Sequence, residues 1–171
     1  MAAPDRCAYA TNASGVWQVV SWDRAHDRHT VLTDKPTGVT RGRPLPDGSG
    51  VVWFDDHAGD EVGRYVVTPF DGGPVRPLAP AVAPGWSGGL SLREGRLAVG
   101  AAGRDGFTIH AGDQEGTRRI YHHRQQAAVG GLSRDGALLA ISHSEHGDAR
   151  HPDLRIVDPL GGAAVADLAD G

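Results

Sequence analysis

Cysteine is almost absent from this chain, because Cys7 is the only one among 171 residues. A single cysteine cannot form an internal disulfide, so a fold held together by a disulfide framework is excluded. Cys7 lies in the apolar run of residues 7–10, which predicts a small buried side chain and not a reactive thiol.

Long hydrophobic runs and basic stretches are missing as well. No apolar run approaches the roughly 20 residues of a membrane-spanning helix, and the first residues lack the apolar core of a signal peptide. Lys and Arg number 17 against 21 Asp and Glu, which gives a net charge of −4 with no basic stripe for nucleic acid. We therefore expect a soluble, cytoplasmic protein with neither a nucleic-acid nor a membrane partner.

Turn-forming residues are what the chain has in abundance. Its 25 glycines and 11 prolines favour many short strands joined by turns over long helices. No segment predicts a convincing helix. Residues 163–169 are rich in alanine, but glycines lie on both sides, and we expect an outer strand there.

The same order of turn, apolar run, polar loop and strand recurs along the chain. It is clearest in residues 131–158, where the turn at Asp135 and Gly136 precedes an apolar run at 138–141 and a strand at 154–157. The equivalent strands are expected at residues 7–10, 16–22 and 29–32, then 51–54, 64–67 and 74–78, then 97–100, 107–110 and 117–122. In the strand at 16–22 both faces read as buried, with Gln18 as the polar exception.

The spacing of these repeats indicates the fold. Gly48 and Gly95 are 47 residues apart, and Gly95 and Gly136 are 41 apart. A period in the forties with four short strands is typical of a β-propeller blade. We predict an all-β propeller of about four four-stranded antiparallel blades, at residues 1–38, 39–82, 83–126 and 127–171. A β-sandwich is the alternative, but it does not explain the recurring order.

The number of blades raises the question of closure. The first unit begins at what would be the second strand of a blade, and open blade faces would expose large apolar patches. We expect the four blades to be part of a larger ring, or to be complemented by a second copy.

Two segments resemble a known family. They are the acidic loop at residues 55–61 with the strand and Gly72-Gly73 hairpin that follow, and the run of Ser133, Arg134, Asp135 and Gly136 before the apolar strand. Both resemble propeller blades of the prolyl oligopeptidase family of serine peptidases, most of all its acylaminoacyl-peptidase-like branch. Blades of TolB-type propellers share the same turns.

The resemblance implies a role. In that family the propeller is non-catalytic, caps an α/β-hydrolase domain and restricts entry to small peptides. The resemblance therefore implies a gating and docking segment, with no hydrolase domain in this chain, whose partners are that catalytic domain and the peptide substrate. The alternatives are a stand-alone TolB- or WD40-like propeller that binds a protein or peptide, and a small metal-using enzyme of the lactonase type.

Four groups of side chains are candidates for chemical sites. Ser87 lies in a G-x-S-x-G sequence, but the prolines before it and the strand after it indicate a linker between blades and not a nucleophile elbow. The histidines read as solvated loop residues and the acidic residues as a solvated, turn-capping loop. Arg118 and Arg119, which could form an anion patch with Tyr121 and His122, read as the charged face of an outer strand. The histidines are His122, His123, His143, His146 and His151, and the acidic residues are Asp55, Asp56, Asp60 and Glu61.

No residue is therefore assigned as catalytic, cofactor-binding or metal-binding, and no cofactor is expected. The four tryptophans are predicted to fill the space between blades. They are Trp17, Trp22, Trp53 and Trp86.

Overall fold

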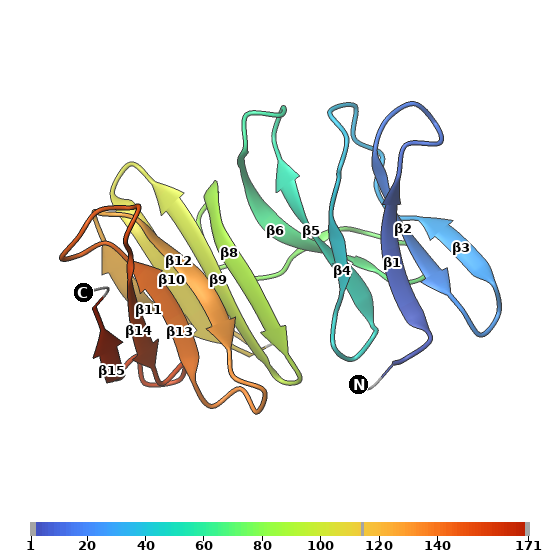
Figure 1. The fold of residues 1–171 in the computed structure, drawn as a ribbon. Coiled ribbons are helices and arrows are strands. Elements are labelled where there is room, and N and C mark those ends of the chain that lie inside the picture. Colours follow the sequence, from blue (N-terminus) through green and yellow to red (C-terminus); the bar gives the residue numbers. More distant parts are fainter. Residues whose placement is uncertain (1–2, 114, 170–171) are drawn as a thin grey trace. The chain divides into compact units, whose positions relative to one another are not determined.

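The computed structural model describes residues 3–113 and 115–169, and every regular element in these ranges is a β-strand (Figure 1). No helix in the described ranges is long and apolar enough to cross a lipid bilayer. The chain divides into two compact units, Met1–Leu78 and Ala79–Gly171, which are described separately.

The first unit holds two antiparallel meanders. The first consists of β1 (Arg6–Thr11), β2 (Gln18–Asp23) and β3 (Arg28–Val31). The second consists of β4 (Gly42–Pro44), β5 (Gly50–Asp56), β6 (Val62–Pro69) and β7 (Arg76–Pro77). Each strand pairs with its neighbour in sequence, which is the connectivity of a propeller blade.

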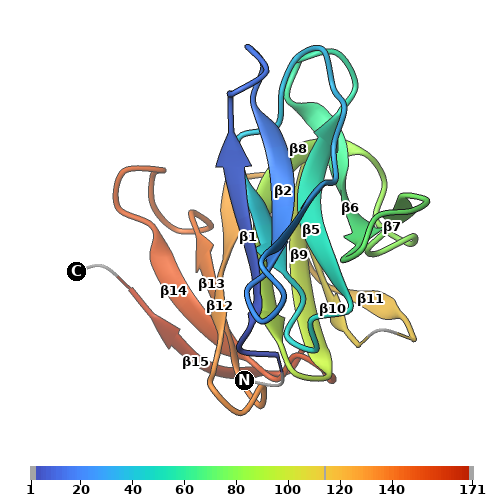
Figure 2. The ribbon, with the colours of Figure 1, turned by 90° about the vertical axis from the view of Figure 1, so that its right-hand side faces the viewer.

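The second unit repeats this arrangement with two four-stranded meanders. One consists of β8 (Gly85–Arg93), β9 (Arg96–Gly103), β10 (Gly106–Gly112) and β11 (Thr117–His123). The other consists of β12 (Ala127–Leu132), β13 (Leu139–His143), β14 (Asp153–Val157) and β15 (Ala164–Leu168), with β15 at its edge (Figure 2). The all-β fold and the propeller class are thus confirmed, with about four blades.

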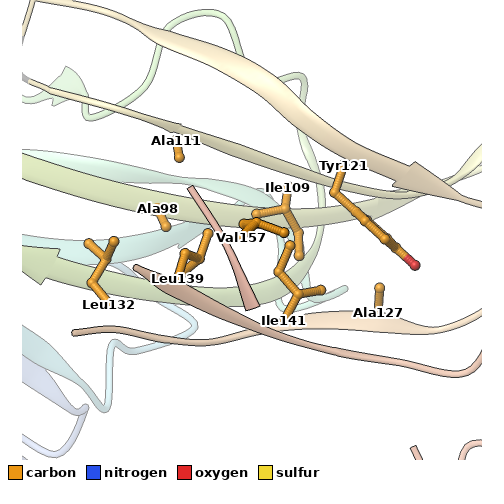
Figure 3. Packing of buried hydrophobic residues seen from close by; sticks show 9 residues of the cluster. All are labelled: Ala98, Ile109, Ala111, Tyr121, Ala127, Leu132, Leu139, Ile141 and Val157. Atoms are coloured by element: carbon orange, nitrogen blue, oxygen red, sulfur yellow. The ribbon is translucent and has the colours of Figure 1, made fainter. Parts of the chain in front are cut away.

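Each unit has its own hydrophobic core. In the first unit, alternate residues of the two meanders meet around Val19, Val51 and Trp53. In the second unit, Ile109, Leu139 and Ile141 are fully buried and point toward one another (Figure 3). Because side chains alternate between the two faces of a strand, only one face of each meander contributes to these cores.

Glycines at the predicted turns have the backbone conformation that the turns require. Gly48, Gly95 and Gly136 have φ values of 72°, 64° and 72°. This left-handed region is costly for residues with a Cβ atom, which is why the repeated turn has glycine at this position.

Some strand boundaries differ from the prediction. β2 begins at Gln18, and Val16 and Trp17 lie exposed in the turn before it. Gln18, the polar exception in this strand, is also buried, and its side chain is satisfied by the Thr33 hydroxyl at 2.7 Å and the Lys35 carbonyl at 2.9 Å. The outer strand expected at 74–78 is only two residues long, with a proline as its second residue that cannot donate to a ladder.

The tryptophans also differ from the prediction. Trp53 is buried in the core of the first unit, and its Nε1–H donates to the Thr68 hydroxyl at 2.9 Å. Trp17 and Trp86 are 44% and 50% exposed, so the prediction that all four fill interior space is wrong for these two. Cys7 is partly buried and carries a free thiol.

Candidate functional site

Ser87 lies inside a strand and not in a linker. It belongs to β8 opposite Ala101, its side chain is exposed, and its Oγ accepts the Gly89 N–H at 3.3 Å. A nucleophile elbow requires a sharp turn from a strand into a helix. Here β8 continues to Arg93 past a β-bulge, so the G-x-S-x-G sequence does not form an elbow. The connection that precedes β8 ends before Gly85, so Ser87 lies in the third position of the strand and not in the linker.

The histidines divide into two classes. The side chains of His146 and His151 are 69% and 71% exposed, as expected of solvated loops, and His122 is also exposed. His143 is fully buried at the end of β13, so the loop prediction is wrong for this residue. Its Nδ1 accepts the Glu145 backbone N–H at 3.4 Å, and Nε2 therefore carries the proton donated to Asp167 Oδ1 at 3.0 Å.

Arg155 on β14 joins His143 to a larger polar cluster. Its guanidinium donates to both Glu145 oxygens, at 2.7 and 3.1 Å, and to Asp167 Oδ2 at 2.6 and 2.9 Å. Glu145 also accepts the Tyr121 hydroxyl at 2.6 Å. We call these five residues, His143, Glu145, Arg155, Asp167 and Tyr121, the polar cluster.

The pKa values of the polar cluster follow from this pairing. Burial raises the pKa of Glu145, but hydrogen bonds from Tyr121 and Arg155 outweigh it and leave that pKa below its usual value. The Arg155 hydrogen bond also lowers the pKa of Asp167. Burial and the bond to Glu145 raise the pKa of Tyr121. The tyrosine therefore stays neutral and the carboxylates stay ionised near neutral pH, which favours a structural tie over acid–base chemistry.

A metal site at His143 and His146 does not form. Their rings lie edge to face at 6.2 Å between centroids, and His146 Nδ1 is 3.4 Å from Asp153 Oδ2. Within residues 3–113 and 115–169, no group of three or more His, Cys, Asp or Glu side chains could hold a metal ion.

The acidic side chains of residues 55–61, at the end of β5 and in the loop after it, do not converge on one point. Asp55 pairs with Lys35 at 2.7 Å, and the Lys35 ammonium also donates to the Asp56 carbonyl at 3.0 Å. Asp60 accepts the Val62 N–H at 3.1 Å, which is the turn-capping role predicted from the sequence. The Asp55 carboxylate thus pairs with a lysine, and the Asp60 carboxylate caps a turn.

The arginine pair on β11 lies beside a β-bulge between Ile109 and His110. Arg119 lies opposite His110, whereas Arg118 lies opposite the buried Ala111. Residues directly opposite each other share a face of the sheet, so the two arginines point to different faces. Arg119 lines an open cleft of about 630 Å³ in the second unit, together with His110 and Arg104. The sequence did not indicate this cleft, because His110 and Arg104 carry no motif.

Comparison with known proteins supports the fold. The sequence matches no protein-family model and no curated protein. Among solved structures, the chain is similar to TolB from Acinetobacter baumannii, with 14% identity over 97% of this chain and a TM-score of 0.63. It is similar to the β-propeller domain of the trilobed protease from Pyrococcus furiosus, with 12% identity over 90% of the chain and a TM-score of 0.64. A structure from a study of two prolyl endopeptidases gives 14% identity, 97% coverage and a TM-score of 0.66.

These similarities define the class of protein as a β-propeller. The chain spans 41% of the TolB chain, 51% of the trilobed protease propeller chain and 27% of the prolyl endopeptidase chain. At such low identities the similarity carries the fold alone, and both peptidase propellers and TolB propellers share it.

Proposed function

We propose that this chain is the non-catalytic propeller segment of a prolyl-oligopeptidase-like serine peptidase of the cytoplasm. It would dock against an α/β-hydrolase domain and restrict access to small peptides. The observation that supports this most directly is the structural similarity to a prolyl endopeptidase and to a protease propeller domain, over 97% and 90% of the chain. The blade-like repeats of turn, apolar run and strand support the same assignment from the sequence.

The outer face of the last meander supports a larger ring. Directly opposite residues on β13, β14 and β15 place Ser142, Leu154 and Leu168 on one face, away from the buried Ile141. Ala140, Ile156 and Ala166 continue that face. A mostly apolar sheet face of this kind is what a neighbouring propeller blade covers, so we propose that a further blade packs here.

The first meander has a comparable outer face. Its register places Tyr9, Val20 and Val31 together and Cys7, Trp22 and His29 together. The His29 ring stacks on Trp22 at 5.5 Å and meets the Tyr9 ring edge to face at 5.8 Å. This aromatic face lies opposite the one that carries Val19 into the core, and it is a second surface on which a blade could pack.

The test uses the natural protein that contains this chain. A fluorophosphonate probe should label it covalently on a serine, and the protein should cleave short peptides but not long ones. A matched version without the propeller segment should lose this size limit. A natural protein that the probe does not label, or one whose size limit is unchanged by removal of the segment, contradicts the proposal.

A stand-alone binding propeller is the second candidate, since two TolB structures are among those similar to this chain. It predicts a natural protein that the probe does not label and that is a stable monomer at low concentration. Sedimentation of the natural protein together with the labelling experiment separates the two functions.

A further inference from the structure

The open cleft of the second unit combines an apolar wall with basic side chains. Ala81, Pro84 and Ala101 form apolar parts of its wall, and Thr108 and His110 of β10 face into it with Arg119 of β11. Arg104 and Asp105, in the turn between β9 and β10, complete its rim. A concave site of about 630 Å³ with an apolar wall and a few convergent polar groups is of the size and kind that binds small molecules.

His110 has an unsatisfied ring nitrogen in this cleft. Its Nδ1 is buried and has no hydrogen-bond partner among the described residues. Burial, followed by the positive charge of Arg119, lowers the pKa of His110, so the ring is neutral near neutral pH. Buried polar atoms are almost always paired in folded proteins, so the unpaired Nδ1 sets His110 apart among the described histidines.

The two arginines of the cleft are also available to a ligand. Within the described ranges, neither Arg104 nor Arg119 forms an ion pair with a carboxylate, in contrast to Arg155, whose guanidinium contacts two. Asp105 is the one acidic group on the rim, and its backbone carbonyl contacts His122 Nε2 at 3.0 Å. With His110 neutral, two positive charges and one negative charge face the cleft, which leaves an excess of positive charge in a protein whose net charge is −4.

We propose that this cleft binds a small oxyanion ligand, with a carboxylate or phosphate group between Arg119 and Arg104 and a hydrogen bond to the His110 imidazole. Arginine presents a planar fork of donors that matches carboxylate and phosphate oxygens. The alanine and proline wall would accommodate a compact apolar body attached to that group. This site goes beyond the proposed function, because it depends on one meander of the second unit and not on a catalytic partner.

The binding test compares two neighbouring arginines of β11. Acetate and inorganic phosphate are titrated separately into the full chain at constant ionic strength, and binding is followed by NMR shifts of the His110 ring. Arg119→Gln should weaken binding about tenfold, since it removes a charge-assisted contact. Arg118→Gln, on the other face of the same strand, removes the same charge and should leave binding within about twofold. The anion that binds more tightly identifies the source of the oxyanion.

The pKa of His110 provides a second readout, which does not require any variant to fold. In the unaltered chain, the bound anion should raise the pKa of His110, because negative charge nearby favours the protonated ring. His110→Asn should weaken binding, followed for this variant by titration calorimetry, while the circular dichroism spectrum stays unchanged. Absence of saturable binding for both anions, or equal weakening by Arg118→Gln and Arg119→Gln, overturns the proposal.

Discussion

Arg155 contacts three other side chains of the polar cluster. It bonds to Glu145 and Asp167, and its guanidinium lies over the Tyr121 ring at 5.8 Å. The side chains of Arg155 and Glu145 are each only 18% exposed. Removing one partner of a buried pair leaves the other charge uncompensated, so Arg155→Met should lower the free energy of unfolding by about 3 kcal/mol. Urea denaturation followed by circular dichroism measures this loss.

Arg24 provides the control for that substitution. It pairs with Asp5 at 2.8 Å, but the two side chains are 59% and 45% exposed. An exposed pair of this kind contributes little, so Arg24→Met should cost less than about 1 kcal/mol. Similar losses for Arg24→Met and Arg155→Met would show that burial does not set the strength of the cluster.

The polar cluster also predicts how stability depends on pH. The pKa values of Glu145 and Asp167 lie below their ordinary values of 4.5 and 3.8 in the folded chain. Stabilisation by such groups is present above those ordinary values and is lost as the pH falls through the lower, folded-state values. The free energy of unfolding should therefore decrease between about pH 5 and about pH 2.5. Urea unfolding across this range should show a shallower decrease in the Glu145→Gln and Asp167→Asn double variant, and an unchanged slope would contradict the assignment.

At the scale of elements, β8 and β9 approach each other unusually closely. A Cβ atom on Gly100 would overlap the carbonyl oxygen of Gly88, at the bulge between Ser87 and Leu90. Only glycine at both positions allows this pairing, so Gly100→Ala should destabilise the second unit by about 2 kcal/mol through forced backbone shifts. Thermal unfolding followed by circular dichroism measures the change.

Gly103 is the matched control because it lies on the same strand. A Cβ atom there would meet nothing within 4 Å, and Gly103→Ala should change the free energy of unfolding by less than about 0.5 kcal/mol. If both alanine variants are equally stable, the close approach of β8 and β9 does not constrain the sheet.

The strands could be predicted where local sequence determines them. Gly48, Gly95 and Gly136 mark turns that need positive φ, and an apolar run follows each turn, so both signals agree. The start of β8 was missed, because two prolines precede it and three of the five residues of Gly85–Gly89 are glycines. In the fold these glycines permit a close strand pair.

The candidate sites were less predictable, since they depend on contacts between distant strands. His143 looked like a loop residue because its hydrogen-bond partner Asp167 lies 24 residues away in sequence. The cleft likewise needs the bulge that turns Arg119 toward His110, and no local pattern predicts a bulge in an outer strand.

For the whole molecule, the repeat was the most informative feature of the sequence. A four-stranded unit cannot bury both of its faces alone, so a repeat of this kind implies neighbours. In the first and last meanders, one face carries core residues such as Val19 and Ile141, and the other face carries exposed residues such as Val31 and Leu168.

The outer face of the last meander therefore predicts how the isolated chain behaves. Leu154 and Leu168 lie directly opposite each other on this face and are 36% and 55% exposed. With no further blade present, burial of this apolar area favours contact with a second copy, so the chain should self-associate as its concentration rises. Aspartate at both positions would place two charges in that contact and should shift the chain to monomer in sedimentation experiments. Leu160→Asp alters an equally exposed leucine in the turn between β14 and β15 and should leave the association unchanged. A parent chain that stays monomeric at every concentration would show that this face needs no partner.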